Sequence, residues 1–298
     1  MTSKPKKTIK KVLDFKANPV EVLTLDELEQ TASERNSGNK PIFGVEHHEL
    51  FGMIIAKMTS MNVQYDVQKI YASDGGEKSF RGASRLPYME KDFGEKSLQS
   101  WLLRRIIGSI HLKQGASKES VGSVGISFHQ RGIQISYGQH IKLCKNMSIY
   151  GIKNVMSTYG EEYNKIPNIT KMIEVVGDWV AEHELKRARD LKIIKRMKET
   201  SVNYQKACEI IGEMSVLRIG KDILRTEKHY ALSQTQITKF TERYVRDFRE
   251  NPENVNNLWK LYNMGTQFHK PGETDIPLIV PNNVTLSDYL INKFKLEN

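Results

Sequence analysis

Basic side chains are the residues of this sequence whose number and spacing point most directly to chemistry. The chain has 298 residues, with 45 Lys and Arg against 35 Asp and Glu, a formal net charge of +10. Three short segments, residues 1–11, 104–153 and 186–198, hold twenty of the basic residues and only two acids. The rest of the chain carries 25 basic and 33 acidic residues. A mildly acidic body with three basic zones indicates an anionic partner.

The middle basic zone falls on a stretch in which apolar and polar residues alternate. Alternation over residues 104–113, 124–128 and 133–137, with a turn at residues 130–132, predicts antiparallel strands with a hairpin. One face would be Ile and Val, and the other Ser, Gly, Gln, His, Lys and Arg. We therefore expect a sheet whose polar face is open to solvent and presents cations to phosphates. Alternation assigns Phe128 and Tyr137 to the apolar core, which leaves Tyr150 and Tyr159 as candidates for base stacking.

The third basic zone lies on a helix predicted over about residues 169–198, whose apolar stripe would cover the apolar face of the sheet. A run of charges is commonly just a solvated helix face. Here, however, three zones share the same sign and the same scarcity of acids, which favours nucleic acid as the partner. The candidate nucleic-acid-binding residues are Arg104, Arg105, Lys113, Arg131, Lys142, Lys145, Lys186, Arg187, Arg189, Lys192, Lys195 and Arg196.

The elements that must position these residues define an α+β fold. We predict an antiparallel sheet (a meander with a hairpin) covered by a long amphipathic helix, followed by a helical C-terminal half. Residues 1–20 would be a flexible basic arm, and residues 21–298 a single domain with its sheet core at about 63–150 and its helical part at about 167–298. Capping pairs predict helix starts at Thr24 and Ser233. The prolines after residue 250 predict broken chain and only a short final helix near residues 286–295.

Several chemistries are excluded or disfavoured by the absence of their motifs. There is no GxxxxGK[ST] loop, and neither HExxH nor CxxC occurs, so we expect no cofactor, no metal and no catalytic residue. His111, His129 and His140 could share the polar sheet face, and Cys144 could act as a nucleophile beside one of them, but a buried structural cysteine is the simpler interpretation. Two cysteines, no secretory signal and no membrane-spanning apolar run predict a cytoplasmic protein with no membrane partner.

Two patches of the sequence resemble a known family. The first is GISFHQRGIQISYGQHIKLCKNMSIYG, residues 125–151, with Cys144, Asn146 and Gly151. The second is NLWKLYNMGTQFHK, residues 257–270. Both are similar to a bacterial and phage family catalogued as "phage/plasmid-like protein", a domain of unknown function. The resemblance implies a phage or mobile-element origin and supplies no activity. The order of elements is also similar to that of the core of single-strand annealing proteins.

The leading hypothesis is a phage or mobile-element protein that binds nucleic acid, single-stranded DNA above all, without sequence preference during replication or recombination. It could assemble as a homo-oligomer. The alternatives are an interaction protein that acts on a host protein, for example against a defence system, and a metal-dependent enzyme acting on nucleic acid. DNA and RNA are not distinguished by the sequence.

Overall fold

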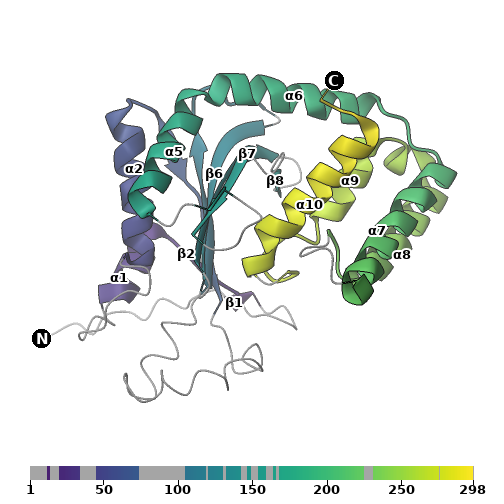
Figure 1. Ribbon diagram of the computed structural model, residues 1–298, viewed down its shortest axis with the longest axis horizontal. Coiled ribbons are helices and arrows are strands. Elements are labelled where there is room, and N and C mark those ends of the chain that lie inside the picture. The colour runs from purple at the N-terminus through teal and green to yellow at the C-terminus, as the bar shows by residue number, and fades with distance from the viewer. Residues whose placement is uncertain are drawn as a thin grey trace, which may run out of the picture.

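The computed structural model describes most of the expected sheet and nearly all of the C-terminal half. The described residues are 12–13, 20–33, 45–73, 105–118, 120–129, 132–141, 146–148, 154–158, 164–165, 168–224, 231–274 and 276–297. They form a sheet with helices on both sides and a helical half beside it (Figure 1). The predicted α+β class, with a helical C-terminal half, is confirmed.

The sheet follows the order β1-β2-β4-β5-β6-β7-β9-β10, with β3 also paired to β5 and β8 to β7. The described pairs are antiparallel apart from β9 with β10, which is parallel. Glycine at position 132 makes the tight return from β6 to β7 that the sequence predicts. The strands are β1 (Val12–Leu13), β2 (Val20–Leu23), β3 (Tyr65–Val67), β4 (Ile70–Ser73), β5 (Arg105–Leu112), β6 (Ser120–His129), β7 (Gly132–Ile141), β8 (Asn146–Ser148), β9 (Val155–Ser157) and β10 (Asn164–Lys165).

One face of the sheet is apolar and is covered by helices α1 (Leu25–Ser33), α2 (His47–Ser60) and α5 (Ile169–Ala181). The predicted capping pair starts α1, since the Thr24 amide donates to Glu27 Oε2 at 2.8 Å and the Glu27 amide donates to Thr24 Oγ1 at 3.2 Å. Phe128 and Tyr137 lie in this core, as alternation predicts. The larger members of the cluster include Leu50, Phe51, Ile54, Met58, Ile106, Ile110, Val124, Ile126, Ile135, Met172, Val176 and Trp179.

The opposite, polar face of the sheet is covered where β5, β6, β7 and β9 lie beneath α10 (Ile276–Phe294), so the expectation of an open polar face is wrong there. Helix α10 packs across it (Figure 1), and Ile276, Ile279, Val280 and Val284 form an apolar cluster with Ile107 of β5 and Val155 of β9. As a result, the polar side chains between those two strands are almost completely buried. The covered polar residues include Ser123, Ser127, Gln134, Ser136 and Ser157.

Helix α10 also corrects the prediction for the last fifty residues. We expected prolines to break the chain there, yet one helix runs from Ile276 to Phe294. Pro277 stands in the first turn, where no intrahelical amide hydrogen bond is required, and Pro281 stands inside the helix at the cost of one such bond. Packing on the sheet outweighs this local cost.

A second core lies in the helical half, built from α7 (Tyr204–Leu224), α8 (Gln234–Glu250), the short 3-10 helix Pro252–Val255, α9 (Leu258–Thr266) and the C-terminal part of α10. Ser233 caps α8 as predicted, with the Ser233 amide donating to Gln236 Oε1 at 2.9 Å and the Gln236 amide donating to Ser233 Oγ at 3.3 Å. No helix among the described residues is long and apolar enough to cross a membrane.

The single covering helix predicted over residues 169–198 is two helices. A break at Glu182 separates α5 from α6 (His183–Glu199). Trp179 and Val180 of α5 enter the sheet core, whereas Ile194 and Met197 of α6 enter the helical core. One straight helix could not reach both cores, and α6 instead runs over the end of the sheet toward the helical half (Figure 1). The basic residues therefore lie on the helix that bridges the two halves.

Candidate nucleic-acid interface

The turn between β5 and β6 carries two exposed lysines, Lys113 and Lys118. The turn is closed by the Ser117 amide, which donates to the Ser120 carbonyl at 2.9 Å, and by the Ser120 amide, which donates to Ser117 Oγ at 2.9 Å. Gly115 has a φ of 65°, a left-handed conformation that favours glycine.

This turn lies against the first turn of α6. A Cβ placed on Gly115 would be 2.7 Å from Glu184 Oε1 and 3.2 Å from Arg187 Cδ. Two basic zones about 70 residues apart in sequence therefore meet at one end of the sheet. Of the candidate residues, Arg187 of α6 lies directly against the turn that carries Lys113.

Most of the α6 cations have partners close by. Lys186 Nζ lies 3.4 Å from a Glu182 carboxylate oxygen, Arg187 Nη1 lies 3.5 Å from Glu184 Oε2, and Lys195 Nζ lies 3.8 Å from Glu199 Oε1. All three pairs join residues three or four positions apart in the sequence. Their acids, Glu182, Glu184 and Glu199, lie just outside the basic segment 186–198. The carboxylates of these pairs are exposed, and so is Lys195, whereas Lys186 and Arg187 are half-buried. An exposed pair contributes only about 0–1 kcal/mol, so a phosphate can replace the carboxylate beside Lys195 at small cost.

Two arginines of α6 are instead held by the C-terminal residues of the structure. Arg189 forms an ion pair with Glu297, and Arg196 Nη1 donates to the Leu296 carbonyl at 3.0 Å. Lys192 lies on the exposed side of the helix and has no ion pair among the described residues. The solvent-facing row of α6 is thus Lys192 with Lys195, while Arg189 and Arg196 help to hold the C-terminal segment in place.

Arg105 does not occupy the position expected for it. It lies on the polar face of the sheet, but that face is covered, and Arg105 is only 8% exposed. The expected phosphate contact by Arg105 therefore has no open surface in this arrangement. Four candidates, together with the lysines of the N-terminal zone, Cys144, Tyr150 and Tyr159, lie outside the described residues. Those four candidates are Arg104, Arg131, Lys142 and Lys145.

Beneath the basic surface of α6 lies a buried acid that the sequence reasoning did not single out. Asp190 is fully buried, and burial raises the pKa of its carboxyl group to about 7, opposed by the Arg189 charge. The helical spacing of the apolar residues that follow Asp190 indicates its burial from the sequence alone. Asp190 stands three, four and seven positions before Ile193, Ile194 and Met197, so it shares their inward-facing stripe.

The start of α6 is fastened to the sheet next to this acid. Tyr137 Oη donates to the His183 carbonyl at 3.4 Å, and burial, followed by the nearby Asp190, raises the pKa of the Tyr137 hydroxyl, which keeps it a donor. His183 Nδ1 lies 3.1 Å from the Val180 carbonyl. The basic turn and the basic helix are therefore held in a fixed relation by the sheet beneath them.

Metal chemistry has little basis in the described part of the chain. Among those residues there is no group of three or more His, Cys, Asp and Glu side chains that could hold an ion. His111 and His140 do meet on the polar face, with ring centroids 4.5 Å apart. Among the described residues, no third side chain completes a metal site with these two histidines.

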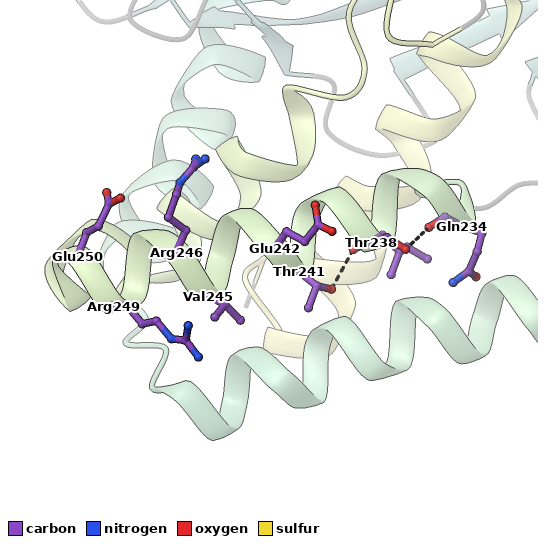
Figure 2. A pocket seen from close by; sticks show the side chains of 9 residues that line it. Gln234, Thr238, Thr241, Glu242, Val245, Arg246, Arg249 and Glu250 are labelled. Atoms are coloured by element: carbon purple, nitrogen blue, oxygen red, sulfur yellow. Dashed lines mark hydrogen bonds between the residues drawn. The ribbon is translucent and has the colours of Figure 1, made fainter.

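A groove runs along α8 (Figure 2). Its lining includes apolar Ile237 and Val245, and its charges are mixed, with Arg246 and Arg249 against Glu242 and Glu250. Thr241 Oγ1 and Thr238 Oγ1 donate back to the carbonyls of Ile237 and Gln234, so their hydroxyl donors are already used. Nothing in this lining selects for an anionic ligand.

The second patch that carried the family resemblance forms α9 and the loop after it. Trp259 and Tyr262 stack with ring centroids 5.7 Å apart. Tyr262 Oη lies 3.1 Å from Ser287 Oγ and 3.3 Å from Asn283 Oδ1, both on α10. The patch thus positions α10 and contributes to the helical core.

Comparison with known proteins adds no relative. No family model matches the chain, and no curated protein or solved structure matches it. The resemblance to the phage/plasmid-like family therefore stays a prediction.

Proposed function

We propose that this protein binds single-stranded nucleic acid, most simply single-stranded DNA, without sequence preference. The observation that supports this best is the meeting of the β5–β6 turn with the start of α6, which joins two basic zones on one surface. Lysine and arginine on such a surface neutralise backbone phosphates and release counterions. A role in replication or recombination of a phage or mobile element rests on the sequence resemblance alone.

The surface that would hold the nucleic-acid backbone, here called the turn–helix surface, consists of exposed lysines together with two half-buried cations. The carboxylates that pair with those two cations are exposed, so a phosphate can compete with them. No bond is made or broken in this function. The turn–helix surface consists of Lys113, Lys118, Lys186, Arg187, Lys192 and Lys195.

The first test is the salt dependence of binding. A labelled single strand of about 40 nucleotides is titrated with the protein between about 50 and 200 mM salt, and four to six phosphate contacts predict a log–log slope of about −3 to −4. A slope near zero, or no binding at low salt, would refute the proposal. The same titration with an RNA strand distinguishes the two nucleic acids.

The second test locates the site. The double variant Lys113→Glu with Lys192→Glu should weaken binding about tenfold or more and flatten the salt slope by roughly two contacts. A matched control, Lys171→Glu with Lys239→Glu, makes the same charge change at exposed lysines on α5 and α8. Equal loss in both variants would mean that only net charge matters, and the turn–helix surface would be rejected.

A further inference from the structure

The interface between α10 and the sheet is chemically mismatched. The sheet side is polar, with Ser127, Gln134 and Ser136 all buried to 1% exposure or less. The helix side is apolar, with Ile276, Ile279 and Val280 facing the sheet cluster. Aliphatic side chains neither donate nor accept hydrogen bonds, so these three residues cannot satisfy the polar groups that they cover.

The unsatisfied atoms gather in one place. Ser127 Oγ, Ser136 Oγ and both amide atoms of Gln134 are buried and have no hydrogen-bond partner among the described residues. The strand register explains why they are together. Ser127 is paired with Gln134 across β6 and β7, and Ser136 lies two positions further along β7. A polar group that is buried without a hydrogen-bond partner destabilises the fold, because it has lost its bonds to water.

The same register places these residues between the two apolar contacts that hold α10. Ile107 on β5 is paired directly with Ser127, and Val155 on β9 is paired directly with Ser136. Both apolar residues belong to the cluster with α10. The helix therefore rests on an apolar residue at each side and spans a polar strip of Ser127, Gln134 and Ser136, here called the polar strip.

The part of α10 above the polar strip is intrinsically weak. Its sequence, IPLIVPNNV, is rich in β-branched residues and prolines, which are poor helix formers. Pro281 removes one backbone hydrogen bond. The flanking segments are well held: Gln236 Nε2 donates to Thr274 Oγ1 at 2.8 Å before the helix, and Ser287 contacts Tyr262 after it. The first turns of α10 therefore lie between two anchored positions, Thr274 before them and Ser287 after them.

We propose that the first turns of α10, Ile276–Val280, are a displaceable cover, and that the polar strip beneath them is a second binding surface for single-stranded nucleic acid. This rests on the proposed function and extends it from the backbone to the bases. Serine hydroxyls and a glutamine amide are side chains that hydrogen-bond to base edges. Arg105 lies on the same face of the sheet, two positions before Ile107 on β5. Binding would begin at the turn–helix surface and then displace the cover.

The main test weakens the cover. Ile279→Asp places a charge in the apolar cluster between α10 and the sheet, which should raise the open fraction and tighten binding of a strand of about 40 nucleotides by about tenfold. Leu278→Asp is the matched control, because the neighbouring Leu278 is 38% exposed and should leave the affinity unchanged. Circular dichroism and thermal melting check that both variants fold. If Ile279→Asp does not fold, the milder variant Ile279→Ala replaces it in the same test.

A second variant changes the polar strip itself. Gln134→Leu removes the unpaired amide and suits the apolar underside of α10, so the melting temperature should rise while nucleic-acid affinity falls about three- to tenfold. A residue with only a structural role would not move these two measurements in opposite directions. In hydrogen exchange, the peptide over residues 276–284 should exchange faster when the strand is bound.

The outcomes separate this proposal from the proposed function. If the wild type binds and Ile279→Asp, Gln134→Leu and hydrogen exchange show no change, the cover is rejected and the turn–helix surface stands. If neither the wild type nor Ile279→Asp binds, both proposals fail. If Ile279→Asp binds the strand and the wild type does not, the result supports the cover, because α10 then limits the access of nucleic acid to the polar strip.

Discussion

Asp190 is a buried carboxylic acid in the middle of a basic helix. It is packed between α6 and β7, and burial raises its pKa to about 7, far above that of an exposed aspartate. In the unfolded chain the same group ionises near pH 4. Between these two values the folded state retains a proton that the unfolded state has lost, so stability falls as the pH rises and is lowest above pH 7.

Asp190→Asn should remove this penalty. The variant should match the wild type near pH 4 and exceed it above about pH 7.5 by up to about 4 kcal/mol, because each pKa unit corresponds to about 1.4 kcal/mol. Urea unfolding at both pH values measures the difference. Asp178→Asn, an exposed position on α5, is the control and should change little at either pH. An equal loss of stability at both pH values would contradict the assignment.

Among the elements, the β5–β6 turn determines whether the basic zones meet. Gly115 combines a left-handed backbone with close contact to Glu184 and Arg187, so no side chain fits there without a shift. The same contact joins the sheet to α6. The candidate binding surface therefore depends on one glycine that carries no charge.

Gly115→Ala should destabilise the fold by about 1–2 kcal/mol through backbone strain and displace the start of α6. Urea unfolding checks the stability, and the nucleic-acid titration should show a weaker affinity. Gly52→Ala is the matched control, because position 52 is an exposed helical site on α2 with open space around it. That control should be neutral or slightly stabilising. Similar losses in the two variants would contradict the role assigned to Gly115.

At the scale of the whole molecule, a sheet core and a helical core are joined by α6 and α10. Two buried titratable groups, Asp190 on α6 and His269 in the helical half, have opposite effects on the pH dependence of stability. His269 in the helical half is fully buried, and burial lowers its pKa to about 4, while its Nε2 donates to the Ala231 carbonyl at 2.7 Å. Because the unfolded histidine binds a proton below about pH 6.5, this group makes the fold lose stability as the pH falls from 6.5 toward 4.

The two effects oppose each other between about pH 4 and 6.5, so the wild-type stability should change little over that range. In Asp190→Asn the histidine acts alone, and stability should fall by up to about 3 kcal/mol as the pH drops from 6.5 to 4. Urea midpoints measured at several pH values for both proteins test this. A variant profile as flat as that of the wild type would contradict the assigned behaviour of His269.

The sequence by itself determined the local features of this protein. Alternation located β5, β6 and β7, the capping pairs at Thr24 and Ser233 located the starts of α1 and α8, and helical periodicity placed the apolar stripe of α5. These features depend on interactions between side chains a few residues apart, so they can be predicted from one sequence. Charge counting likewise located the basic zones, because a count needs no geometry.

Only the tertiary structure decided which surfaces are open. The polar face that alternation predicted is real, but α10, more than 130 residues further along the chain, covers it despite its two prolines. The predicted long helix divides at Glu182 because its two halves serve different cores. Burial and exposure are set by residues distant in sequence, and the packing energy of a core exceeds the local preferences that a sequence pattern reports.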